Sequence, residues 1–157
     1  MTVTGRKAAP PLSGRTIEVP VRFAECDSYG VVWHGHYALY LEQAREAMTA
    51  QFGFTASRSL ALGYRVPITR MEVRYRRPVL ADTTVRVTAR LRAPEAALLL
   101  VDYEIRDTAG ELLASAATEQ VVVKEDGELL VSLPAALATL VKKILENQDG
   151  SPLTAES

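Results

Sequence analysis

Residues 22–54, which read RFAECDSYGVVWHGHYALYLEQAREAMTAQFGF, decide the fold that we predict for this chain. We expect a strand at the start, a turn at Asp27–Gly30, where aspartate, serine and glycine are typical of turns, and a helix that begins near His34–His36. Apolar side chains then recur at helical spacing and predict one buried stripe, formed by Tyr37, Leu41, Ala44, Met48 and Phe52. The positions beside this stripe are also fairly apolar, so other elements are expected to wrap the helix. A helix over residues 36–52 would be about 25 Å long, which matches a strand of about eight residues, so one sheet could cover it.

The segments on either side of this stretch alternate between apolar and polar residues, as strands do. Before it, Val19, Val21 and Phe23 are expected on one face of a strand that starts near Thr16. After it, residues 68–131 read as strands and short turns, with buried faces predicted at Met71, Val73 and Tyr75, at Val85, Val87, Ala89 and Leu91, at Leu99, Val101, Tyr103 and Ile105, and within residues 112–123. Strands joined by such short connections must be antiparallel. We therefore predict an α+β fold in which an antiparallel sheet wraps around one long central helix.

The domain boundaries follow from the same patterns. We predict one domain over residues 16–147, with flexible tails at residues 1–15 and 148–157. The domain is expected to end in an amphipathic helix over residues 134–147, whose apolar face is formed by Leu137, Leu140, Val141, Ile144 and Leu145. The outer strands of a small curved sheet need a cover or a partner, so we expect a homodimer that continues the sheet, or a homotetramer.

Composition argues against several classes of protein. With 157 residues and a formal net charge of −1, the chain lacks the basic excess typical of a nucleic-acid-binding domain. Cys26 is the only cysteine, so no internal disulfide can form, and no apolar run approaches the roughly 18 residues of a membrane span. Residues 1–15 are polar and contain Pro10 and Pro11, unlike the apolar centre of a signal peptide. We therefore expect a soluble cytoplasmic protein with neither a membrane nor a nucleic-acid partner.

The run DSYGVVWHGHY at residues 27–37, followed by EQARE at residues 42–46, resembles the hotdog-fold acyl-CoA thioesterases of the 4-hydroxybenzoyl-CoA thioesterase type. The pattern of that family is an aspartate, two variable residues, a glycine, two β-branched residues, an aromatic residue, a histidine or tyrosine, one residue, a polar residue and a tyrosine. His36 departs from it, because asparagine is common there in relatives, which leaves open how the helix is capped and whether His36 transfers protons. The resemblance implies the hotdog fold and hydrolysis of an acyl-CoA or acyl-carrier-protein thioester, with no metal and no cofactor.

The same resemblance implies roles for individual residues. It makes Asp27 the catalytic carboxylate, as a nucleophile or as a base for water, and the backbone N–H of His34 the group that polarises the thioester carbonyl. Helix N-termini carry unpaired N–H groups and a partial positive charge, which suit a developing oxyanion. Gly30, Trp33 and Tyr37 are expected to bind substrate around this site, although Trp33 and Tyr37 are equally compatible with a place in the core.

A second group of candidates is a cluster of arginines. Residues 70–92 contain seven arginines but only Glu72 and Asp82 as acids, which makes this span locally +5. Such a cluster is compatible with a solvated sheet face. It could also bind the phosphates of coenzyme A, or the acidic surface and phosphopantetheine of an acyl carrier protein, because arginine binds phosphate through paired hydrogen bonds. We predict Arg90 and Arg92 as the substrate-binding members of the cluster.

Other interpretations of these residues are open at this point. Asp27 alone could be a turn residue that binds its own backbone, and His34 and His36 could bind a metal together with Asp27. Cys26 is not expected to be a nucleophile, because alternation directs its side chain away from that of Asp27. Two further functions are compatible with the hotdog fold. One is a hydratase or dehydratase in which His34 or His36 exchanges the α-proton of the substrate, and the other is a non-catalytic module that binds acyl thioesters.

Overall fold

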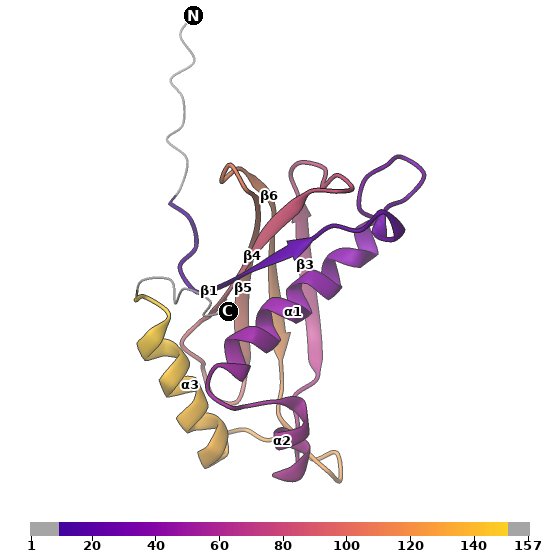
Figure 1. Cartoon of the computed structure of the whole chain (residues 1–157). Helices are drawn as coiled ribbons and strands as arrows, with labels where there is room; N and C mark the ends of the chain where they lie inside the picture. The colour runs from indigo at the N-terminus through magenta and orange to yellow at the C-terminus, as the bar shows by residue number, and fades with distance from the viewer. Residues whose placement is uncertain (1–9, 151–157) are drawn as a thin grey trace, which may run out of the picture.

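The computed structural model describes residues 10–150 and contains a five-stranded antiparallel sheet crossed by one long helix (Figure 1). The strands are β1 (Arg15–Pro20), β3 (Ile68–Tyr75), β4 (Thr84–Leu91), β5 (Leu99–Asp107) and β6 (Leu112–Gln120), in the spatial order β1-β4-β5-β6-β3. Hairpins join β4 to β5 and β5 to β6. The short connection from β3 to β4 is not a hairpin, because β3 pairs with β6 at one edge of the sheet. The predicted α+β architecture is confirmed.

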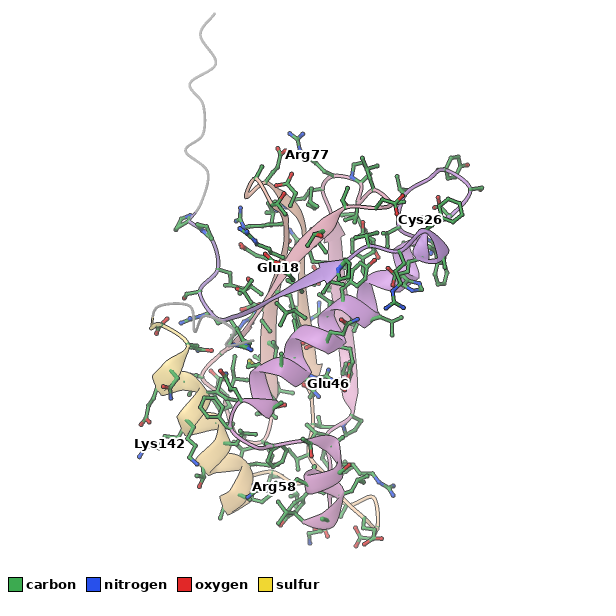
Figure 2. The ribbon with its side chains drawn as sticks, in the orientation of Figure 1. Glu18, Cys26, Glu46, Arg58, Arg77 and Lys142 are labelled. Carbon is green, nitrogen blue, oxygen red and sulfur yellow. The ribbon has the colours of Figure 1, made fainter. Side chains whose placement is uncertain are left out.

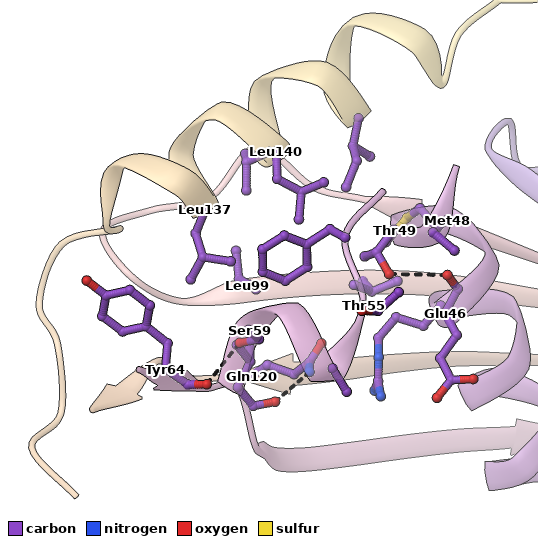
Figure 3. A pocket seen from close by; sticks show the side chains of 18 of the residues that line it. Glu46, Met48, Thr49, Thr55, Ser59, Tyr64, Leu99, Gln120, Leu137 and Leu140 are labelled. Carbon is purple, nitrogen blue, oxygen red and sulfur yellow. Dashed lines mark hydrogen bonds between the residues drawn. The ribbon is translucent and has the colours of Figure 1, made fainter. Parts of the chain in front are cut away.

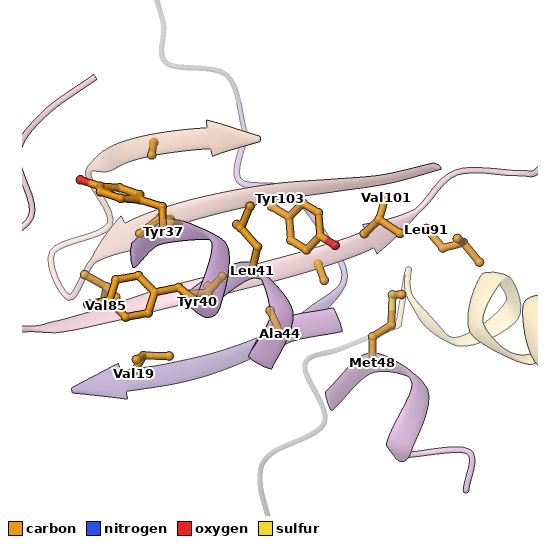
Figure 4. Packing of buried hydrophobic residues seen from close by; sticks show 14 of the residues in the cluster. Val19, Tyr37, Tyr40, Leu41, Ala44, Met48, Val85, Leu91, Val101 and Tyr103 are labelled. Atoms are coloured by element: carbon orange, nitrogen blue, oxygen red, sulfur yellow. The ribbon is translucent and has the colours of Figure 1, made fainter. Parts of the chain in front are cut away.

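The central helix begins as a short 3₁₀ turn, η2 (His34–His36), and continues as α1 (Tyr37–Ala50). Its predicted stripe is confirmed at four positions that are at most 3% exposed: Tyr37, Leu41, Ala44 and Met48. Tyr40, which the spacing placed beside the stripe, is fully buried because β1 and β4 both pack against this side of α1 (Figure 4). The inward faces of β4 and β5 complete this core, with Val85, Val87, Val101 and Tyr103 all at most 2% exposed.

One predicted buried face is open to solvent in the single chain. Met71 and Tyr75 of β3 are 38% and 51% exposed, although Tyr75 points toward α1 and packs edge-on against Tyr37. The expected burial of this face is therefore wrong for Met71 and Tyr75 in one chain, whereas Val73 is half-buried against the core. The reason is the position of α1, which packs over β1 and β4 and leaves the face of β3 largely uncovered.

Two local predictions are corrected. Phe23 was expected to share the buried face of Val19 and Val21, but it starts a 3₁₀ turn, η1 (Phe23–Glu25), and is 78% exposed. The strand predicted over residues 112–123 ends at Gln120, and β7 (Val123–Lys124) pairs instead with β2 (Tyr64–Arg65). Between α1 and β2, Gly53 with a φ of +71° is followed by the short helix α2 (Ala56–Ala61).

The last helix, α3 (Ala135–Asn147), agrees with its predicted apolar face, since Leu137, Leu140, Val141 and Ile144 are buried. Gln148 was expected to fray but is buried, because its side-chain amide accepts from the Leu91 N–H at 3.0 Å and donates to the Leu91 carbonyl at 2.7 Å. Most of the two predicted tails, residues 1–9 and 151–157, lies outside the described residues. Over residues 10–150, no helix is long and apolar enough to cross a membrane.

Candidate active site

Asp27 lies in a tight turn just before the start of the central helix. Its N–H donates to the Val31 carbonyl at 2.9 Å, and its own carbonyl accepts from the Gly30 N–H at 3.0 Å. Gly30 has a φ of +75°, a left-handed conformation that favours glycine and explains the residue at this position. The carboxylate accepts the N–H of Tyr29 at 2.8 Å through Oδ1 and is half-buried. One carboxylate oxygen is thus used by the turn, while Oδ2 has no protein donor within residues 10–150.

The turn is joined to the beginning of the helix by backbone pairing. Cys26 and Val32 form an antiparallel bridge, and the Trp33 N–H donates to the Glu25 carbonyl at 3.0 Å. This pairing places the segment that carries Asp27 next to the segment that leads into η2, at the end of the molecule marked by Cys26 in Figure 2. The segment of Asp27 thus lies beside the segment that leads into the helix, and a shared site at this place stays a prediction from the sequence.

His34 opens η2, and its backbone is well placed for an anion. Among the described residues, its N–H has no hydrogen-bond acceptor, as expected for the first residue of a helix. Its carbonyl, in contrast, accepts the Tyr75 hydroxyl at 2.9 Å, which ties the start of the helix to β3. A free N–H at the start of η2, which leads directly into the 14-residue α1, can stabilise negative charge on a bound carbonyl oxygen. Tyr75 was not selected from the sequence, where alternation marked it only as a buried strand residue.

Trp33 and Tyr37 differ in how far they are exposed to solvent. Trp33 is about half exposed, and its indole lies across Gly35 so closely that a Cβ at Gly35 would overlap the ring. An alanine at this position would therefore require the half-exposed indole to move. Tyr37 is only 3% exposed and contacts Tyr40 and Tyr75, and burial raises the pKa of its phenol. Trp33 is thus accessible to a ligand at the helix start, whereas Tyr37 supports the site from the core.

Glu25 is a residue of this site that sequence reasoning missed. Its Oε1 accepts the Arg22 N–H at 2.8 Å and the hydroxyl of the buried Tyr40 at 3.0 Å, while Oε2 lies 3.5 Å from His36 Nε2. Burial, and next the hydrogen bond to Glu25, raise the pKa of Tyr40 well above its ordinary value. The alternation of an extended segment could not have identified it, because Glu25 is the last residue of the 3₁₀ turn η1.

Arg90 and Arg92 lie at the other end of the sheet. They flank Leu91, the last residue of β4, which contacts Gln148 after α3 rather than the start of α1. Arg90 is paired with Asp149 at 2.7 Å and holds the pKa of that carboxyl below its ordinary range. Arg92 makes two hydrogen bonds to Asp102, at 2.7 and 2.6 Å. Within one chain, these two arginines are therefore not brought together with Asp27.

The remaining arginines of the cluster are mostly paired as well. Their carboxylate partners come from neighbouring strands and turns: Glu18, Glu72, Glu111 and Glu119. The local excess of positive charge counted along the chain is therefore largely offset in space. Over residues 10–150, no group of three His, Cys, Asp or Glu side chains is arranged to hold a metal ion, so His34 and His36 do not form a three-ligand site with Asp27.

Comparison with known proteins gives a consistent set of relatives. The family model described as the thioesterase-like superfamily matches residues 21–141. The YneP protein of Bacillus subtilis (strain 168), provisionally named an acyl-CoA thioesterase, is 28% identical over 109 residues, which cover 69% of this chain and 79% of that protein. The 1,4-dihydroxy-2-naphthoyl-CoA hydrolase of Thermosynechococcus vestitus is 25% identical over 87% of this chain and 94% of its own length. The crystal structure of the DHNA-CoA thioesterase from Staphylococcus aureus is 26% identical and superposes with a TM-score of 0.77 over 84% of this chain and 91% of that chain.

Proposed function

This chain belongs to the thioesterase-like superfamily and has the hotdog fold, and on that premise we propose that it hydrolyses an acyl-CoA thioester. The observation that carries the proposal is the joint arrangement of Asp27 and the His34 N–H within the span that matches the family. Relatives named as an acyl-CoA thioesterase and as a 1,4-dihydroxy-2-naphthoyl-CoA hydrolase support this class of reaction. An acyl-carrier-protein thioester presents the same reactive group and is the second candidate substrate.

In the proposed reaction, the thioester carbonyl oxygen accepts the His34 N–H at the positive end of η2 and α1. Asp27 then either attacks the carbonyl carbon or removes a proton from the water that attacks it. The C–O bond forms while the oxyanion is stabilised by the N–H and the helix dipole, and the C–S bond then breaks. The thiolate leaves as a good leaving group and takes up a proton as free thiol. Where Asp27 attacks directly, the acyl group remains on Asp27 as a mixed anhydride, and a water molecule then hydrolyses it to the free acid and restores the carboxylate. Where Asp27 acts as a base, water supplies the new C–O bond directly. Neither route needs a nucleophile other than Asp27 and water.

We further propose that the working unit is a homodimer in which two β3 strands pair. β3 is an edge strand, and its exposed face carries Met71 and Tyr75 beside an uncovered row of backbone groups. Two copies related by a twofold axis would pair these edges antiparallel and give one continuous sheet. Both central helices would then lie on the same face of that sheet.

The test is thiol release from a panel of acyl-CoA and acyl-carrier-protein thioesters by the wild type and by Asp27→Asn. Asparagine keeps an oxygen for the Tyr29 N–H, so the turn should survive while the hydrolytic rate falls by at least about a hundredfold. Asp126→Asn is the matched control, because Asp126 accepts the Glu128 N–H at 2.9 Å in the same kind of turn, far along the chain. Full activity in a folded Asp27→Asn protein would overturn the role of Asp27, and no thiol release by wild type from any thioester would overturn the reaction class.

A further inference from the structure

The two ends of the central helix differ in how their polar surroundings are used. The C-terminal half of α1, together with α2 and α3, borders a cavity of about 670 Å³ over the sheet (Figure 3). In the wall of this cavity, the Ser59 hydroxyl already donates to the Tyr64 carbonyl at 2.9 Å. At the start of the helix, in contrast, the His34 N–H has no acceptor within residues 10–150 and is free for a ligand. Its direction therefore decides whether it can meet the carbonyl oxygen of a substrate.

Two peptide groups, one on each side of the His34 Cα, set this direction. The N–H belongs to the Trp33–His34 peptide, whose carbonyl accepts the His36 N–H at 2.9 Å. The next peptide joins His34 to Gly35, and its carbonyl accepts the Tyr75 hydroxyl at 2.9 Å. Each peptide group is planar, so holding both carbonyls leaves the His34 backbone little freedom to rotate. One backbone contact and one side chain thus hold the free N–H in its direction.

Tyr75 supplies a contact that the turn η2 does not contain. Gly35 has no Cβ, so the backbone around the His34–Gly35 peptide has more conformational freedom than it would beside another residue. The turn has no side-chain cap, and within residues 10–150 no side chain other than that of Tyr75 hydrogen-bonds to the backbone of residues 33–36. The hydroxyl of Tyr75 therefore restrains a peptide that is intrinsically mobile.

The hydroxyl of Tyr75 is itself held in place by the core and the sheet. The Tyr75 ring packs edge-on against Tyr37, with ring centroids 4.7 Å apart and planes at 86°, and Tyr37 is buried. Directly after Tyr75, the N–H groups of Arg76 and Arg77 both donate to the Leu113 carbonyl, at 2.9 and 3.0 Å, which anchors this end of β3 to β6. The position of the hydroxyl against the helix start is thus fixed from both sides.

The contact is not needed to satisfy the phenol of Tyr75. This residue is 51% exposed, so its hydroxyl can bond to water where the bond to the protein is lost. Losing the contact should therefore change the stability of the chain little. The larger effect is expected on the backbone of His34, because an oxyanion donor is effective only when it is oriented before the reaction.

We propose that Tyr75 is a positioning residue of the candidate site, whose hydroxyl holds the His34 backbone so that the His34 N–H is directed at the oxyanion. The inference rests on the proposed thioesterase function. In this role the hydroxyl acts through the backbone rather than on the substrate. The N–H binds the oxyanion more strongly than the neutral carbonyl of the bound substrate, so loss of the hydroxyl should lower kcat and leave KM nearly unchanged.

Tyr75→Phe tests this role, because it removes the hydroxyl and keeps the ring against Tyr37. Thiol release is measured with butyryl-CoA, lauroyl-CoA and benzoyl-CoA, and kcat for the best of them should fall at least about tenfold while KM stays within about twofold. Tyr103→Phe is the matched control, since it also removes a hydroxyl hydrogen bond, the 3.2 Å contact with Thr118, but within the buried sheet. Its kcat should match that of the wild type. Tyr75→Leu also lacks the hydroxyl and guards against a folding defect in Tyr75→Phe.

A substrate analogue separates the direction of the donor from a general loss of activity. In the dithioester of the same acyl group, sulfur replaces the carbonyl oxygen, and sulfur is a weak hydrogen-bond acceptor. Misdirecting the His34 N–H should therefore slow hydrolysis of the thioester more than that of the dithioester, whose consumption is followed by its ultraviolet absorbance. The ratio of kcat/KM for the thioester to kcat/KM for the dithioester should fall at least about fivefold in both Tyr75 variants and stay unchanged in Tyr103→Phe.

The outcomes separate the role of Tyr75 from the proposed function. An unchanged kcat in a folded Tyr75→Phe protein would overturn the positioning role. Equal losses on the thioester and the dithioester would make Tyr75 a structural contact only and would also overturn it, while the thioesterase function stands in both cases. Light scattering checks that each variant keeps the assembly of the wild type, so that a change of oligomeric state cannot imitate the effect. No thiol release by the wild type from any acyl-CoA or acyl-carrier-protein thioester would instead overturn the function itself, and this inference with it.

Discussion

Replacing Glu25 by alanine is the most informative perturbation of the candidate site. Its carboxylate joins the Arg22 N–H, the Tyr40 hydroxyl and His36, and its carbonyl accepts the Trp33 N–H. Glu25→Ala removes the side-chain contacts and leaves the backbone contact in place. The phenol of Tyr40, which is fully buried, then has no acceptor, and the loop that carries Asp27 loses its side-chain connection to α1.

The expected cost follows from these contacts. An unpaired buried hydroxyl costs about 1–3 kcal/mol, and the lost bond to the more exposed Arg22 N–H adds up to about 1 kcal/mol. We therefore expect Glu25→Ala to lower the free energy of unfolding by about 2–4 kcal/mol. Tyr40→Phe should cost only about 1 kcal/mol, because it removes the buried hydroxyl together with its bond. In the double variant the unpaired hydroxyl is absent. Its loss of unfolding free energy should therefore be smaller than the sum of the losses in the two single variants by about 1–2 kcal/mol.

Urea unfolding of the four proteins in this cycle measures the coupling, and thiol release measures its effect on the site. Glu18→Ala is the control, because Glu18 forms an exposed pair with Arg86 and should change stability by at most about 0.5 kcal/mol. The folded fraction of Glu25→Ala should show a lower kcat, since Asp27 and the His34 N–H are no longer held in one geometry. Additive stability losses in the cycle, or an unchanged kcat, would refute the reasoning.

Three further predictions concern neighbouring residues. Gly35→Ala should push the indole of Trp33 away from the helix start and reduce hydrolysis, and a shift in intrinsic fluorescence would report it directly because Trp33 is the only tryptophan. The raised pKa of Tyr40 means that the folded protein favours the neutral phenol more than the unfolded chain does. The contribution of Tyr40 to the free energy of unfolding is therefore complete below pH 10 and is lost as the pH rises further. In urea unfolding at alkaline pH, Tyr40→Phe should lose less stability than the wild type. Met71→Lys should convert the proposed dimer to a monomer in light scattering, whereas Val131→Lys, at a more exposed apolar position outside β3, should not.

The sequence predicted the parts of the fold that depend on local periodicity. The spacing of Tyr37, Leu41, Ala44 and Met48 identified the buried side of α1, and alternation identified the inward faces of β4 and β5. The glycine that ends the predicted Asp27–Gly30 turn was equally informative, since Gly30 has a positive φ. These patterns are visible because each depends on residues close together in the chain.

Features that depend on which strands are neighbours were not visible. Nothing in the alternation of Met71, Val73 and Tyr75 shows that β3 sits at an edge, beyond the reach of α1. For the same reason, charge counted along residues 70–92 overstated the positive character of the surface. The compensating carboxylates of Glu18, Asp102 and Glu119 come from three other strands.

In the candidate site, too, local features were predicted from the sequence and long-range contacts were not. The local motif selected Asp27 and His34, and their backbone geometry fits the chemistry that the motif implies. Glu25 was missed because its role depends on Tyr40, fifteen positions later in the sequence. Both the turn that carries Asp27 and the start of α1 are therefore held by contacts that a short motif does not contain.

The exposed edge of β3 links the fold to the proposed oligomer. Met71 and Tyr75 leave an apolar face of this strand open in the single chain, and β3 is the last strand on its side of the sheet. An open apolar edge is a liability in a monomer, because it can pair with other chains. In the proposed homodimer the partner's β3 covers this edge, and the start of the central helix, which the Tyr75 hydroxyl contacts through the His34 carbonyl, then lies close to the subunit interface.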